Sequence, residues 1–120
     1  MAFDWNEYLN LAAFLKGDKV NYLPEAGIRS AISRAYYAAY CHARNFAVAK
    51  QSFVASGKAD DHDLLIKHYA GRGMATVANA LDGLRRWRNQ CDYDNRVTLN
   101  LDSTVQFAIL QSRKIFADLT

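Results

Sequence analysis

Apolar residues recur every three or four positions through most of this chain, which is the spacing of amphipathic helices, and no strand-like alternation persists. The first helical segment covers residues 4–16. Asp4 and Glu7 match a capping box at its start, and Gly17 is placed to end it. A connector then leads to Pro24, which suits the first position of a helix because no hydrogen bond is lost there.

The longest helical segment runs from Pro24 to about Lys50, and different residue types gather on its two sides. One stripe consists of Ile28, Ile32, Ala35, Ala39, Ala43 and Phe46. The opposite side brings together Arg34, Tyr37, Cys41 and Arg44. Because most of the circumference is apolar, aromatic or small, we expect this helix to be central and to pack on more than one side.

The next two helical segments differ in length. A loop around Gly57 precedes a short helix over residues 62–70, with Asp60 or Asp61 as its cap. Glycines on both sides of Arg72 then break the chain. A long helix follows, over residues 74–90 or a little further.

The last helix begins after a connector over residues 95–101, with Asn100 or Asp102 as its cap. Its inward face consists of Val105, Ala108, Ile109, Ser112, Phe116 and Leu119. Together the segments predict an all-α fold, a four- to five-helix antiparallel bundle that forms a single domain over residues 1–120.

The composition narrows the possible settings and ligands. The net charge of +3 and the pI near 9.0 are compatible with nucleic-acid binding without requiring it. Two cysteines make no disulfide framework, the chain begins without a signal peptide, and no apolar run approaches the roughly 20 residues that span a bilayer. We therefore expect a cytoplasmic protein without a membrane segment. His62 and His68 are too widely spaced to predict a metal site, and we expect no cofactor.

The stretch RRWRNQCDYDN at residues 85–95 concentrates the charged residues. Arg88 falls on the same inward stripe as Leu84, whereas Arg86 points to the opposite side. A guanidinium on a core-facing stripe costs several kcal/mol unless it is paired, and Asp92 is placed one turn later to pair with it. Two interpretations stay open: a structural Arg88–Asp92 pair that fixes the helix end, or an arginine that presents its fork to a phosphate.

Two segments together resemble the HEPN family of nucleotide-binding domains from higher eukaryotes and prokaryotes. RSAISRAYYAAYCHARNFA at residues 29–47 looks like their second helix, and RWRNQCDYD at residues 86–94 is similar to their Arg-Asn motif. The likeness is strongest to small stand-alone prokaryotic members, which have a Ser-Arg-Ala-Tyr-Tyr core and an Arg-Asn-x-x-Asp-Tyr-Asp ending. DDHDLLIKHYA at residues 60–70 resembles their short helix, and the likeness covers roughly residues 25–110.

The resemblance implies a homodimer in which the arginine motifs of both protomers line a shared cleft. Many members are metal-independent endoribonucleases that act as toxins or defence effectors, and small ones are often encoded beside a nucleotidyltransferase antitoxin. Carried onto this chain, the resemblance implies that RNA or a nucleotide binds at Arg34, Arg85, Arg88 and Asn89. Asn89 and Asp92 would orient the guanidinium of Arg88.

The chain departs from the family at the motif histidine. In active members an arginine stabilises the phosphate charge, and a histidine after four to six intervening residues takes part in proton transfer. Residues 93–95 occupy those positions after Arg88, and no histidine occurs after His68. Endoribonuclease activity is therefore open, and the alternative is a non-catalytic interaction module that docks a nucleotidyltransferase or another partner.

Proton transfer in this chain would need a substitute for the missing histidine. Asp92 and Tyr93 follow Arg88 closely, and these three are the candidate catalytic residues. His62 or His42 would have to reach the cleft from elsewhere in the chain. In related toxins the partner nucleotidyltransferase attaches AMP to a tyrosine just past the motif, and Tyr93 lies at a similar position. A modified Tyr93 would place negative charge beside Arg88 and block an anionic substrate.

Overall fold

The computed structural model describes residues 3–17 and 24–120, and all regular secondary structure in these ranges is helical. The helices are α1 (Asn6–Leu15), α2 (Pro24–Lys50), α3 (Asp61–Gly71), α4 (Ala75–Tyr93) and α5 (Leu101–Asp118). The prediction of an all-α bundle is confirmed. Most of the predicted connector before Pro24 lies outside the described residues. In the described ranges, no helix is long and apolar enough to cross a membrane.

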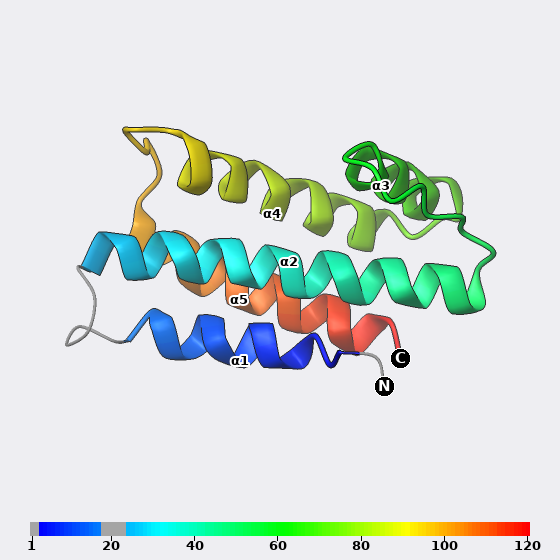
Figure 1. Cartoon of the computed structure of the whole chain (residues 1–120), viewed down its shortest axis with the longest axis horizontal. Coiled ribbons are helices and arrows are strands. Elements are labelled where there is room, and N and C mark those ends of the chain that lie inside the picture. Colours follow the sequence, from blue (N-terminus) through cyan, green and yellow to red (C-terminus); the bar gives the residue numbers. More distant parts are fainter. Residues whose placement is uncertain (1–2, 18–23) are drawn as a thin grey trace.

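Four helices, α1, α2, α4 and α5, lie side by side, and α3 packs at one end of α4 (Figure 1). α1 and α4 run opposite to α2, whereas α5 runs in the same direction behind it. α2 contacts each of the other four described helices. α1 and α4 lie on opposite sides of α2 and, over their described lengths, do not touch each other.

The composition of α2 explains its central place. Its fully buried alanines are small enough for neighbouring helices to approach closely, and they are Ala31, Ala35, Ala38, Ala39, Ala43 and Ala47. Ile32 is also fully buried on the predicted stripe, while Ile28 and Phe46 at its ends are half-buried. Tyr36 and Tyr40 bury aromatic rings on α2 as well. The prediction of a central helix packed on several sides is confirmed.

The start of α1 differs from the prediction. The helix begins at Asn6 with Trp5 at its N-cap position, one residue after the predicted cap. The Asp4 carboxylate accepts a hydrogen bond from the N–H of Asn6 at 3.0 Å, and the expected capping box with Glu7 does not form. At the start of α5, the Asn100 side chain caps the helix, which confirms one of the two predicted alternatives.

Neither aspartate at the start of α3 caps that helix. Asp60 occupies the N-cap position without a side-chain cap bond. Asp61 is buried, and its carboxylate accepts hydrogen bonds from the N–H groups of Ser56 and Gly57, both at 2.9 Å. The Ser56 hydroxyl donates to the same carboxylate at 2.6 Å. Asp61 therefore ties the preceding loop to α3, which helps to fix where the short helix lies.

Candidate functional site

Arg88 lies on the buried face of α4, as its place on the apolar stripe predicted. The residue is only 6 % exposed. Its guanidinium carbon lies 5.1 Å from the ring centre of Tyr36 and 5.2 Å from that of Tyr37, both on α2. The ring centre of Tyr93 is 5.9 Å away. Such cation–aromatic contacts contribute about 0.5–2 kcal/mol each, but they replace only part of the hydration that the charge loses on burial.

The hydrogen-bonding groups of Arg88 are incompletely paired. Its Nη1 lies 3.9 Å from Oδ2 of Asp92, which is too long for a hydrogen bond. The same Oδ2 accepts a hydrogen bond from the Ser33 hydroxyl at 3.2 Å. Nε of Arg88 is buried without a hydrogen-bond partner among the described residues, and a buried unpaired donor costs about 1–3 kcal/mol. The predicted Arg88–Asp92 pair therefore forms but leaves donors unused.

Arg85 adds a second positive charge one helical turn earlier on α4. Its Nε is also buried, and no described residue accepts a hydrogen bond from it. Arg86 instead points to solvent, with a 75 % exposed side chain that pairs with Asp82 at 2.7 Å. Over residues 3–17 and 24–120, Asp92 is the one carboxylate within 4 Å of Arg85 or Arg88. Arg88 thus has one distant counter-charge, and Arg85 has no carboxylate within 4 Å among the described residues.

His62 approaches these arginines from the first turn of α3. Its ring stacks on Tyr40 of α2 with ring centres 4.0 Å apart, and its Nδ1 is hydrogen-bonded to the Tyr36 hydroxyl. Burial, and then the positive charges of Arg85 and Arg88, lower the pKa of His62 to about 4. The imidazole is therefore neutral at neutral pH. The sequence left open where His62 lies, and the structure brings it beside the arginines.

Tyr36 connects the histidine to the arginines. Burial raises the pKa of Tyr36 above its ordinary value, so its hydroxyl keeps its proton. That hydroxyl can then donate to Nδ1 of His62, which leaves the imidazole proton on Nε2. The residues around these contacts are called the Arg88 cluster below: Tyr36, Tyr37, Tyr40, His62, Arg85, Arg88, Asp92 and Tyr93.

His42, the other histidine considered for this region, lies against α5. Its Nε2 donates a hydrogen bond to the carbonyl oxygen of Leu119 at 2.6 Å, and its ring stacks on Phe116. These contacts give His42 a structural role in holding the end of the chain against α2. Of the two histidines, only His62 therefore contacts the tyrosines of the Arg88 cluster.

Among the described residues, the side chains of the two further predicted binding residues, Asn89 and Arg34, make no hydrogen bond to the Arg88 cluster. Asn89 is exposed, and within the described ranges no hydrogen bond joins its side chain to Arg88. The orienting contact expected from Asn89 and Asp92 therefore comes from Asp92 alone. The guanidinium carbon of Arg34 lies 5.2 Å from the ring centre of Tyr8 on α1. A role for Arg34 or Asn89 in binding stays a prediction.

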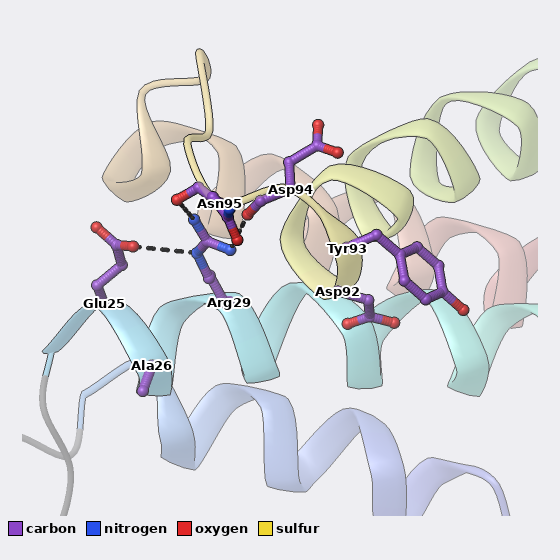
Figure 2. A pocket seen from close by; sticks show the side chains of 7 residues that line it. All are labelled: Glu25, Ala26, Arg29, Asp92, Tyr93, Asp94 and Asn95. Atoms are coloured by element: carbon purple, nitrogen blue, oxygen red, sulfur yellow. Dashed lines mark hydrogen bonds and ion pairs between the residues drawn. The ribbon is translucent and has the colours of Figure 1, made fainter.

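Arg29 lies where α2 meets the end of α4, and it was missed in the sequence analysis. It reaches from α2 to the end of α4 (Figure 2). Its Nη1 donates to the carbonyl oxygens of Asp94 at 2.7 Å and Cys91 at 3.3 Å. Its Nη2 donates to the carbonyl oxygen of Asn95 at 3.2 Å, and its Nε donates to the Glu25 carboxylate at 3.1 Å. Arg29 thereby fixes the turn that follows α4.

The spacing of residues on α2 contains a signal for this contact. Arg29, Ser33 and Tyr36 follow one another at intervals of four and three, so they share one side of the helix. All three contact residues outside α2, in α3, in α4 or in the turn after α4. A search for a polar stripe beside the apolar one would have grouped Arg29 with the tyrosines.

A surface hollow of about 450 Å³ adjoins the contacts of Arg29 (Figure 2). Its lining consists of Glu25, Ala26, Arg29, Asp92, Tyr93, Asp94 and Asn95. Asp92 and Tyr93 also belong to the Arg88 cluster. The hollow therefore continues the surface on which Tyr93 is exposed, next to the guanidinium of Arg88.

No protein-family model, no curated protein and no solved structure matches this chain. Across the described residues, no group of three or more His, Cys, Asp or Glu side chains is placed to hold a metal ion. The Arg88 cluster itself offers two guanidinium groups with unused donors, a neutral imidazole and an exposed tyrosine. These groups suit an anionic ligand.

Proposed function

We propose that this protein is a HEPN-like helical protein that binds RNA or a nucleotide at Arg85 and Arg88 and acts as a homodimer. In this proposal it is the toxin or effector half of a prokaryotic toxin–antitoxin or defence pair, with a nucleotidyltransferase as antitoxin. Support comes from the resemblance of residues 29–47 and 86–94 to HEPN segments and from the chemistry of the Arg88 cluster.

The observation that carries the proposal is the buried Nε of Arg88, for which no described residue is a hydrogen-bond partner. Buried polar groups in folded proteins are nearly always satisfied, and a buried cation usually has a close counter-charge. Phosphate oxygens accept bidentate hydrogen bonds from a guanidinium fork. Arg85 would supply a second cation to the same anion. A phosphate at the Nη groups of Arg88 would thus supply both hydrogen-bond acceptors and a counter-charge.

Binding of a fluorescein-labelled single-stranded RNA tests this proposal. Arg88→Met removes the charge and the fork, and hydrogen bonds to charged groups contribute about 1.5–3 kcal/mol. We therefore expect an affinity loss of roughly 10- to 150-fold. Arg86→Met is the matched control, because it removes the same charge from a solvent-facing position of the same helix. Equal affinities of the two variants would contradict the proposal.

Cleavage is tested separately, with an end-labelled RNA pool in EDTA. Metal-free cutting that is lost in Arg88→Met would assign endoribonuclease activity to the Arg88 cluster. His62 is then the first residue to test as a substitute for the missing histidine, because it contacts the tyrosines that surround Arg88. Asp92 and Tyr93 are the next candidates. Binding without cutting, by protein freed of any partner and of tyrosine modification, would leave RNA or nucleotide binding as the function.

The alternative function is a non-catalytic module that docks a nucleotidyltransferase or another protein. The observation that favours it is a set of large exposed apolar side chains on α1 and α5, namely Leu11, Phe14, Phe107 and Leu110. The two helices contact each other, and large exposed apolar side chains on neighbouring helices are candidates for a protein interaction surface. In this alternative the Arg88–Asp92 pair is structural, and Arg88→Met leaves RNA affinity unchanged.

A further inference from the structure

Tyr93 differs from the other described tyrosines in its exposure. The residue is 73 % exposed, whereas the others are buried or half-buried. A single exposed aromatic ring is ordinary on a protein surface. Tyr93, however, lies beside a nearly buried arginine, with 5.9 Å between its ring centre and the guanidinium carbon of Arg88. The exposed ring and the arginine with unused donors therefore belong to one surface.

The backbone around Tyr93 is held in place on both sides. Tyr93 is the last residue of α4, and the carbonyl oxygens of Cys91, Asp94 and Asn95 accept hydrogen bonds from Arg29. Figure 2 shows the ring projecting from this helix end, beside the side chain of Asp92. A ring on a fixed backbone loses little conformational entropy when a flat ligand group stacks on it.

The arrangement matches the two parts of a nucleotide. An anion bound to the guanidinium of Arg88 would lie close to Tyr93, because the guanidinium carbon is 5.9 Å from the centre of that ring. In a nucleotide the base is joined to the phosphate through the sugar alone, so a bound phosphate brings a base close to this ring. Bases of all four kinds stack on tyrosine, because each has an aromatic face. Tyr93 can therefore contribute to affinity without choosing a sequence.

We infer that Tyr93 is a stacking platform for an unpaired base and that the ligand of the Arg88 cluster is single-stranded RNA. This inference rests on the proposed function, because it assumes that a nucleotide phosphate binds Arg85 and Arg88. Inside a duplex both faces of a base are covered by its neighbours, so apart from the two end pairs an unpaired base is needed to present a face to Tyr93.

Fluorescence anisotropy with a labelled twelve-nucleotide RNA strand, and with the duplex of the same strand, tests the inference. The single strand should bind more tightly than the duplex. Tyr93→Ala should lower affinity for the strand roughly 5- to 150-fold, as expected for the loss of one stacked base, whereas Tyr93→Phe should retain it. Phe14→Ala should leave affinity unchanged, because it removes an exposed ring from α1, which does not contact α4.

A strand of the same length with abasic sugars separates stacking from phosphate binding. It should bind the natural protein more weakly than the intact strand does, by a factor similar to that of Tyr93→Ala. The Tyr93→Ala protein should bind both strands equally, because the stacking contact is already gone. Equal loss of affinity for the abasic strand in both proteins would overturn the inference.

Failure of the inference and failure of the proposed function give different results. If Arg88→Met loses RNA affinity and Tyr93→Ala does not, the stacking role is overturned and RNA binding stands. If no RNA binds, or if Arg88→Met binds as the natural protein does, both are overturned. If Tyr93→Ala changes the oligomeric state and leaves RNA affinity unchanged, Tyr93 is an interface residue, and the stacking role is overturned.

Discussion

Arg29 and Arg88 cross the junction between α2 and α4 in opposite directions, and they meet different surroundings. Arg29 extends from α2 and donates hydrogen bonds to three backbone carbonyls at the end of α4 and to the Glu25 carboxylate. Arg88 extends from α4 toward the tyrosine rings of α2, with Asp92 at 3.9 Å. Both side chains are largely buried, 19 % and 7 % exposed, so burial does not distinguish them.

The two arginines differ in their hydrogen-bond partners, and this difference separates a structural arginine from one that suits a ligand. Carbonyl groups at a helix C-terminus lack partners within the helix and carry partial negative charge, so Arg29 satisfies them while they balance its own charge. Aromatic faces attract the guanidinium of Arg88 but leave its Nε without an acceptor in the described residues. Arg88 therefore keeps the capacity to bind an oxyanion, whereas four of the five N–H groups of Arg29 already donate hydrogen bonds.

The largest expected effect is on stability, from Arg29→Met. This change leaves the carbonyls after Cys91 without their donor and removes several charge-assisted hydrogen bonds at once. We expect the free energy of unfolding to fall by about 2 kcal/mol, which corresponds to about 8 °C in Tm for a chain of this size. Thermal unfolding measures it. A fall no larger than that of Arg86→Met, a solvent-facing control, would contradict a structural role for Arg29.

Arg88→Met should move stability in the other direction or not at all. Replacing a poorly paired buried cation by an apolar side chain of similar length is often neutral or stabilising, here by up to about 2 kcal/mol. Asp92 would lose its distant partner at little cost, because it is 29 % exposed and still accepts from Ser33. Chemical denaturation decides the point. A loss as large as that of Arg29→Met would assign Arg88 a structural role instead.

Because His62 is neutral in the folded protein, we expect the free energy of unfolding to depend on pH. Its ordinary pKa is 6.5, and burial, Arg85 and Arg88 lower it to about 4 in the fold. Between these values the unfolded chain binds a proton that the folded chain does not, so stability falls as the pH falls from 6.5 to 4. Water screens this half-buried ring, and we therefore expect a loss of only about 1 kcal/mol.

Denaturation at pH 7 and pH 4.5 measures this loss, and a matched variant identifies its source. His62→Gln keeps an acceptor for the Tyr36 hydroxyl and should abolish most of the pH dependence. Hydrogen bonds from Ser56 lower the pKa of Asp61, so its contribution is lost only as the pH falls below 3.8. Arg88→Met should raise the pKa of His62 by removing a positive charge. An unchanged pKa in an NMR titration would show that the two residues do not interact.

The arrangement of α2 and the direction of Arg88 could be predicted because both depend on local periodicity. The apolar residues of α2 cover most of its circumference, which predicts a central helix. Leu81, Leu84 and Cys91 define a stripe on α4, and Arg88 falls within it at helical spacing. The type of secondary structure and the buried side of a helix both follow from the order of residues within one segment. For α2 and for Arg88, that order was sufficient.

The partners of these residues could not be predicted, because they come from distant segments. Tyr36 and His62 are 26 positions apart, and their contact depends on how the loop held by Asp61 turns α3 toward α2. Arg29 lies more than 60 positions from the carbonyls that it binds. The orientation of one helix against another depends on packing over its whole length, which periodicity within one segment does not contain.

The smallest expected effect comes from Asp92→Asn, and it concerns the affinity of Arg88 for RNA. Asp92 competes with an anion for Arg88, and an amide in its place still accepts from the Ser33 hydroxyl without a charge. A partly exposed ion pair contributes about 0.2–1 kcal/mol, so RNA affinity should rise roughly 1.5- to 5-fold. Asp82→Asn removes the same charge beside the exposed Arg86 and should have less effect, because solvent and salt screen it. Lower affinity of Asp92→Asn would instead mean that Asp92 orients the guanidinium of Arg88 toward the phosphate. Arg88 would then resemble Arg29, which is held in place by acceptors of the protein itself.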